Sequence, residues 1–168
     1  MEHEDTIDTG AVTGKLRALA QDMPLKILVV DDDDLERSLV ADELQVRGFE
    51  VERAADGVQA LSILESQSFP VILVDWSMPV MDGIELTQRM RAIGMDDSYV
   101  IMLTARDTTL DYQAGYHAGV DDYLTKKVRD TELLARIHAG LNTFNLRRSL
   151  KQTRAALAAA LAGKADAA

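Results

Sequence analysis

The sequence predicts an α/β protein built on a doubly wound, five-stranded parallel sheet. Short apolar runs such as KILVV (26–30) and VILVD (71–75) show no alternation of polar and apolar residues, which is typical of strands covered on both faces. Segments with apolar residues at helical spacing separate these runs, so that strands and helices alternate along the chain. With 168 residues, 47% of them apolar, the chain is long enough for one domain with a substantial core and an appendage.

The elements can be assigned in order. The first helix carries Leu35, Leu39, Val40 and Leu44 at helical spacing, and the second carries an apolar face around Leu61. Glycines end the first and third helices, and right-handed crossovers between strands leave few possible topologies. We expect strands at 26–30, 49–54, 71–75, 99–104 and 121–125, helices at 34–48, 56–67, 83–94 and 109–120, and a long C-terminal helix from Asp130.

Chemically active side chains follow four of the predicted strands. Asp31 and Asp32 come directly after the first strand, Asp75 ends the third, Thr104 ends the fourth and Lys126 follows the fifth. In an open parallel sheet, the carboxyl ends of the strands lie at one edge, where ligands collect. The run DDDD (31–34) also supplies a helix cap, for which one aspartate suffices. The sequence therefore predicts a site of acids, a hydroxyl and an amine at this edge.

These residue types favour phosphoryl transfer assisted by a metal ion. Three clustered carboxylates need a cation, and ligands that are all oxygen suit Mg²⁺. A carboxylate such as Asp75 can also attack phosphorus and form an aspartyl phosphate. The ammonium group of Lys126 and the hydroxyl of Thr104 could then stabilise the phosphoryl oxygens.

Four motifs in order give the chain a family resemblance. VVDDD, VDWSMPVMDG, MLTA and DDYLTKK, each at a strand end, resemble the receiver domain of two-component response regulators over residues 25–142. The resemblance implies a flavodoxin-like sheet with strand order 2-1-3-4-5. It also implies a phosphohistidine donor on a sensor histidine kinase or a histidine phosphotransfer protein.

The same resemblance implies a role for each matching residue. It implies that phosphorylation moves the switch residues and changes the surface formed by the fourth helix, the fifth strand and the fifth helix. The implied roles are phosphoacceptor for Asp75, metal ligands Asp31, Asp32, Asp75 and the carbonyl of Ser77, switch residues Thr104 and Tyr123, phosphate-binding Lys126, and Ser77 and Arg106 beside the path of water that hydrolyses the phosphoryl group.

The chain departs from the family pattern after Lys126. Lys127 occupies the place of a proline that usually follows a cis bond in the family. Because a cis bond without proline costs roughly 2.5–4 kcal/mol, we expect a trans Lys126–Lys127 bond and an altered loop.

Composition excludes several function classes. The net charge of −10 argues against direct nucleic-acid binding. The absence of cysteine excludes disulfides and thiolate sites, and no apolar run approaches the roughly 20 residues of a membrane span. A cytoplasmic protein is expected.

The two ends extend beyond the predicted receiver. Residues 1–24 could form a short helix or be disordered. Residues 143–168 continue the last helix with an approximate heptad seam, which favours a homodimer through a weak coiled coil. The seam comprises Leu146, Leu150, Thr153, Leu157 and Ala160.

Alternative functions remain open from the sequence. The chain could be the receiver portion of a longer regulator with an enzymatic output such as a diguanylate cyclase, or a pseudo-receiver that binds partners without phosphorylation. It could also be a small Mg²⁺-dependent phosphatase or mutase, although such enzymes generally place a second aspartate where Ser77 lies.

Overall fold

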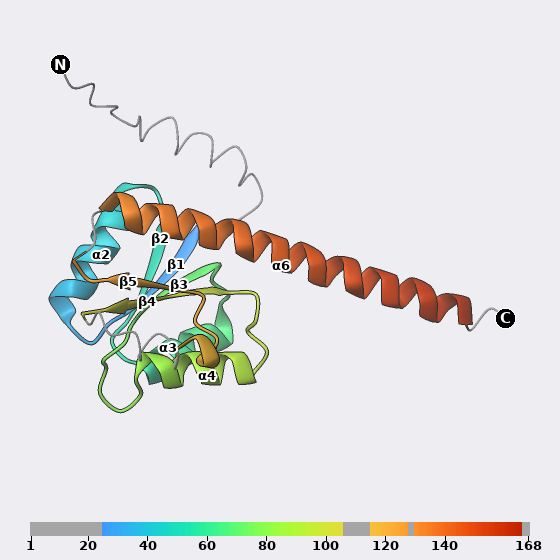
Figure 1. Cartoon of the computed structure of the whole chain (residues 1–168), viewed down its shortest axis with the longest axis horizontal. Coiled ribbons are helices and arrows are strands. Elements are labelled where there is room, and N and C mark those ends of the chain that lie inside the picture. The colour runs from blue at the N-terminus through green and yellow to red at the C-terminus, as the bar shows by residue number, and fades with distance from the viewer. Residues whose placement is uncertain (1–24, 106–114, 128–129, 166–168) are drawn as a thin grey trace, which may run out of the picture.

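The structure, a computed structural model, describes residues 25–105, 115–127 and 130–165. Five parallel strands form one sheet in the order β2-β1-β3-β4-β5, as Figure 1 shows. This confirms the predicted fold class and strand order. The strands are β1 (Lys26–Val30), β2 (Glu50–Ala54), β3 (Val71–Asp75), β4 (Tyr99–Thr104) and β5 (Asp122–Thr125).

Helices cover both faces of the sheet. Helices α2 and α6 lie on one face, and α3 and α4 lie on the other (Figure 1). Residues 115–118 are helical, whereas 119 and 120 are not, so the predicted 109–120 helix ends two residues early. Residues 109–114 of that prediction lie outside the described residues, as does the predicted N-terminal helix within 1–24. The described helices are α2 (Asp34–Val46), α3 (Gly57–Ser66), α4 (Gly83–Ala92) and α6 (Asp130–Ala165).

The central strands are buried on both sides, which explains their continuous apolar runs. Leu28 and Ile72 point into the layer that contains α3 and α4. Their neighbours Val29 and Leu73 point into the layer with α2 and α6. All four side chains are fully buried. A strand between two helical layers needs apolar residues at every position, so the pattern loses its alternation.

Aspartates begin three of the helices. Asp33 Oδ1 accepts hydrogen bonds from the amides of Leu35 and Glu36, each at 2.9 Å. Asp56 and Asp82 cap α3 and α4 in the same way. The DDDD run therefore divides by role, because Asp33 satisfies the free amides of α2 and the other three are not needed for that purpose.

Helix α2 buries only part of its apolar face. Ala41 and Leu44 are fully buried, whereas Leu35 and Leu39 are 68% and 61% exposed. Apolar residues at helical spacing therefore differ widely in burial along this helix. Helical periodicity places residues on one side of a helix, but the extent of the surface against which they pack decides which of them are covered.

Helix α6 is continuous through the predicted domain boundary at 142–143. Its first turns pack on the sheet through Leu133, Ile137 and Leu141, and Phe144 further along is also buried. The remainder extends well past the sheet (Figure 1). None of the described helices is long and apolar enough to cross a membrane.

Charged side chains fasten α6 where it leaves the sheet. The carboxylate of Asp121, just before β5, accepts hydrogen bonds from Arg91 of α4 at 2.8 Å and from Arg147 of α6. Arg147 also donates to the carbonyl of Ser98 at 3.3 Å, and Lys151 pairs with Asp97 at 3.1 Å. These contacts tie the direction of α6 to the end of the sheet opposite the carboxyl ends of the strands.

Close backbone packing at Gly83 generates a prediction about stability. A Cβ at this position would lie 2.5 Å from the carbonyl oxygen of Asp75 and 2.7 Å from the sulfur of Met102. Because overpacking costs typically 1–3 kcal/mol, Gly83→Ala should lower the free energy of unfolding by about 2 kcal/mol, measured by urea denaturation. Gln88→Ala, at an exposed position of the same helix, should leave it nearly unchanged. Equal stability of the two variants would contradict the packing argument.

Candidate functional site

Three carboxylates converge at the carboxyl edge of the sheet. Asp31 follows β1 and Asp75 ends β3, and these two strands are neighbours. Their side chains are buried, while Asp32 is exposed. One oxygen from each of Asp31, Asp32 and Asp75 lies within 4.8 Å of the others. The parallel sheet therefore brings residues 44 positions apart (75 − 31) into one acidic cluster.

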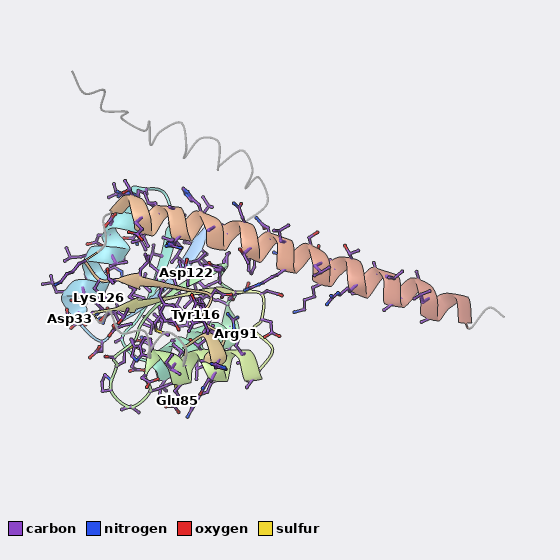
Figure 2. The ribbon with its side chains drawn as sticks, viewed as in Figure 1. Asp33, Glu85, Arg91, Tyr116, Asp122 and Lys126 are labelled. Carbon is purple, nitrogen blue, oxygen red and sulfur yellow. The ribbon has the colours of Figure 1, made fainter. Side chains whose placement is uncertain are left out.

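Lys126 provides the positive charge of this cluster. Its ammonium nitrogen lies 3.0 Å from Oδ2 of Asp31 and 3.1 Å from Oδ1 of Asp75. It also contacts Glu36 in the first turn of α2. The backbone amide of Lys126 donates to the carbonyl of Thr104 at 2.9 Å, which holds the residue at the end of β4. Figure 2 places Lys126 beside Asp33 at the start of α2.

Burial and neighbouring charges together shift the pKa of Asp75 and of Lys126. Burial raises the pKa of the Asp75 carboxyl, and the repulsion from Asp31 and Asp32 acts in the same direction, while Lys126 opposes it. For Lys126, burial lowers the pKa, but hydrogen bonds to Glu36, Asp31 and Asp75 outweigh it, so the pKa is raised. The ammonium group therefore remains charged at neutral pH and partly offsets the repulsion among the acids.

Thr104 and Tyr123 lie on the last two strands of the sheet, β4 and β5. Thr104 is buried at the end of β4 and pairs with Thr125 of β5. Tyr123 is half-buried between two other aromatic rings, with ring centroids 6.0 Å from Trp76 and 5.3 Å from Tyr116. Trp76 directly follows Asp75, so this aromatic cluster borders the acidic one.

The absence of a side chain at Gly115 makes room for the Tyr123 ring. A Cβ at Gly115 would lie only 1.4 Å from the Tyr123 hydroxyl oxygen. The inward position of this ring thus depends on a glycine eight residues earlier in the chain (123 − 115). Sequence analysis missed Gly115, because nothing in its local pattern signals a contact with β5.

The structure brings four of the eight predicted site residues into direct proximity. Asp31, Asp32, Asp75 and Lys126 form the cluster just described. Ser77 lies in the exposed loop after β3. Its carbonyl stays a predicted ligand of the metal ion. Arg106 lies outside the described residues. The two described histidines, His117 and His138, do not belong to the acidic cluster.

The peptide bond after Lys126 and the contact of Lys126 with Glu36 of α2 complete the description of the site. The Lys126–Lys127 bond is trans, since the described segments contain no cis peptide bond. This confirms the expected trans bond, and the altered loop stays a prediction. Glu36 was missed by the sequence analysis although it contacts Lys126. The only available signal was its place in the first turn of a helix that begins beside the site.

The donor set fits a hard divalent cation. Asp31, Asp32 and Asp75 offer only oxygen atoms, in one compact group, and include an exposed carboxylate that an ion can reach. Such sets suit Mg²⁺ better than softer metals, which prefer nitrogen or sulfur. With no cysteine in the chain and no histidine among the three cluster residues, the site offers no soft ligand.

The fold and this site define a class of protein, and comparison with known proteins agrees with it. Residues 27–138 match the family model described as the response regulator receiver domain. The chain belongs to this family. Among curated relatives, the response regulator MprA of Mycobacterium sp. (strain KMS) is 43% identical over 117 residues, which are 70% of this chain and 50% of that protein. The chain thus spans about half the length of the curated relatives it matches.

Solved structures show the same fold. The chemotaxis protein CheY4 of Vibrio cholerae is 35% identical with a TM-score of 0.66, and the match covers 69% of this chain and 98% of that chain. A structure described as adenylate cyclase from Rhodopirellula baltica is 33% identical with a TM-score of 0.70, and covers 78% of this chain and 97% of that chain.

The charge buried at Asp75 generates a second prediction. Asp75→Asn should raise the free energy of unfolding at neutral pH in buffer free of divalent cations, because it removes a buried, repelled carboxylate. The native pKa of Asp75 is raised above its ordinary value of 3.8. The native state therefore binds this proton more tightly than the unfolded chain does, and wild-type stability falls as the pH rises from 3.8 through the native pKa.

The test is chemical denaturation of both proteins across pH. The stabilisation by Asp75→Asn should be full above the native pKa and should vanish below the ordinary pKa. Asp42→Asn, at a more exposed carboxylate that pairs with Arg53, should not stabilise the protein. A less stable Asp75→Asn protein at neutral pH would contradict the prediction.

Proposed function

We propose that this chain is a phosphorelay receiver that accepts a phosphoryl group from a phosphohistidine onto Asp75. The observation that carries the proposal is the position of Lys126, whose ammonium contacts Asp75 and Asp31 at once. A cation held against a carboxylate nucleophile is placed to stabilise charge on a phosphoryl group as that group binds there. Membership of the receiver family supports the same assignment.

The transfer proceeds by displacement at phosphorus. A carboxylate oxygen of Asp75 attacks the phosphorus of the phosphohistidine, and a P–O bond forms as the P–N bond breaks. The electron pair of the broken bond remains on the imidazole nitrogen, so the donor leaves as an ordinary histidine. Lys126 neutralises part of the charge on the phosphoryl oxygens, and the hydroxyl of Thr104 donates a hydrogen bond to one of them.

Asp31, Asp32 and Asp75, with the carbonyl of Ser77, would hold Mg²⁺ in this site. When bound, the ion supplies positive charge that offsets both the acidic cluster and the phosphoryl oxygens. The compact all-oxygen cluster supports this assignment.

A conformational switch follows from the new group at Asp75. The phosphoryl group adds charge and acceptor oxygens, toward which Thr104 moves, and Tyr123 occupies the space that this movement leaves. The buried position of Thr104 and the half-buried position of Tyr123 beside Trp76 support such a coupling. Phosphorylation thereby favours a second arrangement of the surface near β5 and α6.

The donor is a sensor histidine kinase or a histidine phosphotransfer protein. Two leucines of α2, Leu35 and Leu39, are largely exposed close to the site, and Leu39 lines the same groove as Lys126 and Asp31. Apolar side chains at this position offer a contact surface for the protein that presents the phosphohistidine.

The third prediction tests the phosphoacceptor. Incubation with Mg²⁺ and a small phosphodonor such as acetyl phosphate should add one phosphoryl group to the wild-type chain, detected by intact mass. Asp75→Asn should remain unmodified, whereas Asp42→Asn should be modified as wild type is. Lys126→Ala should react about 100-fold more slowly, the usual cost of removing one charge-stabilising donor from such a site.

The alternatives give different results in the same experiment. A stable single adduct supports a receiver, rapid turnover of the donor without an adduct supports a phosphatase or mutase, and no reaction supports a pseudo-receiver. An adduct that persists in Asp75→Asn would show that phosphorylation occurs elsewhere.

The output of the chain is proposed to pass through α6. The chain covers about half of its curated relatives, and the similar structure from Rhodopirellula baltica is described as an adenylate cyclase. The first observation favours a receiver that forms part of a longer regulator. The second favours an enzymatic output for that regulator, such as a cyclic-nucleotide or diguanylate cyclase. In that arrangement the projecting helix connects the receiver to the output.

Helix α6 is also proposed to pair with a second copy of itself. Leucines on the projecting part are all more than half exposed, although leucine is costly to leave in water. Thr153 and Ala160 complete the predicted seam and would make its packing weak. The exposed leucines are Leu146 (72%), Leu150 (52%), Leu157 (60%) and Leu161 (61%).

The fourth prediction concerns this pairing. Leu157→Glu should weaken self-association at least about tenfold, because a carboxylate in an apolar seam loses its hydration. Gln152→Glu adds the same charge off the seam and should have little effect. Sedimentation equilibrium measures the dissociation constant, and a wild-type chain that is monomeric at high concentration would contradict the proposed dimer.

A further inference from the structure

Glu36 gives Lys126 a third carboxylate partner that the proposed phosphotransfer does not use. Lys126 already contacts Asp31 and Asp75, both buried. The carboxylate of Glu36 reaches the same ammonium group from the first turn of α2, 90 residues away in the chain. An ammonium group has three N–H donors, and three carboxylates surround this one.

The three partners differ in exposure, which determines which of them can be replaced by water. The side chains of Asp31 and Asp75 are 4% and 7% exposed, whereas that of Glu36 is 49% exposed. A buried charge that loses its partner is strongly destabilised. Glu36, in contrast, can turn into solvent at small cost, since exposed ion pairs contribute only about 0–1 kcal/mol. The contact with Glu36 is therefore the one that breaks most easily.

We propose that Glu36 is a releasable tether that holds Lys126 in the unphosphorylated state and must release it when a phosphoryl group binds at Asp75. This inference rests on the proposed function and concerns the regulation of the same site. Glu36 is a positioning residue, because it acts through Lys126.

The charges of the site explain why release is required. A phosphoryl group at Asp75 carries about −1.5 to −2 charge and strong acceptor oxygens. It competes with Glu36 for the ammonium of Lys126 and repels the Glu36 carboxylate. The Glu36–Lys126 contact must therefore break when the phosphoryl group binds, and the loss of this contact makes the phosphorylated state less favourable. A chain without this contact should bind a phosphoryl group more tightly.

Substitutions at Glu36 separate the contact from its charge. Glu36→Gln removes the charge and the ion pair. Glu36→Asp keeps the charge but shortens the side chain, and Lys126 cannot follow it because Asp31 and Asp75 hold the ammonium in place. Glu43→Gln is the matched control: it removes a carboxylate from the same helix that pairs with Arg47 at 3.2 Å rather than with Lys126.

The measurement is binding of beryllium fluoride in the presence of Mg²⁺, a mimic of a phosphoryl group on a carboxylate. Trp76 is the only tryptophan, adjoins Asp75 and contacts the Tyr123 ring, so its fluorescence reports on the site. Glu36→Gln and Glu36→Asp should each lower the apparent dissociation constant about two- to fivefold, which corresponds to a half-exposed ion pair. Glu43→Gln should bind as wild type does, and urea denaturation should show all variants folded.

The outcomes that overturn the inference are distinct from those that overturn the proposed function. If wild type binds beryllium fluoride but Glu36→Gln binds no more tightly, Glu36 is not a tether and the receiver function is unaffected. If Glu36→Gln tightens binding but Glu36→Asp behaves as wild type, general charge repulsion rather than the contact is responsible, and the tether is again wrong. If wild type neither binds beryllium fluoride nor forms an adduct with acetyl phosphate, the proposed function and the inference fail together.

Discussion

The repulsion among three carboxylates at one edge of the sheet is the constraint on which the rest of this molecule depends. Asp31, Asp32 and Asp75 present oxygens within 4.8 Å of one another, an arrangement that free side chains in water would avoid. Asp31 and Asp75 cannot move apart, because Asp31 directly follows β1, Asp75 ends β3, and these neighbouring strands have a fixed register. The repulsion is offset by Lys126, which reaches the acids from the far strand β5. Such a cluster is stabilised by added positive charge, and the proposed binding of Mg²⁺ rests on this property.

The scaffold around the cluster serves to hold this unfavourable arrangement in place. Apolar layers on both faces of the sheet fix β1 and β3, and the start of α4 packs directly on the carbonyl of Asp75 through Gly83. Strand β5 runs between the two opposite edges of the sheet, from the root of α6 to the acidic site. One end of it carries Lys126 at the site, and the other end follows Asp121, which binds Arg91 and Arg147 at the root of α6. In the proposed switch, this strand is the physical connection between the site and the helix that leaves the domain.

Much of the fold was predictable because the signals are local. Buried strands such as VILVD are readable from unbroken apolar runs, and Asp33, Asp56 and Asp82 mark helix starts by their capping chemistry. The convergence of Asp31, Asp32, Asp75 and Lys126 was also predictable, since parallel strands place all their carboxyl ends at one edge. The exposure of Leu35 and Leu39 was not, because periodicity gives the direction of a helix face but not the area that covers it.

The sequence by itself determined the order of the elements, the residue types at the strand ends and the family to which they belong. Only the tertiary structure decided which groups touch Lys126, where the ring of Tyr123 fits and how α6 is anchored. Glu36 lies 90 residues from Lys126, and Gly115 matters only because the hydroxyl of Tyr123 lies against it. Such contacts depend on distances between side chains on different elements. Those distances are set by the packing of whole layers, for which no short stretch of sequence carries a signal.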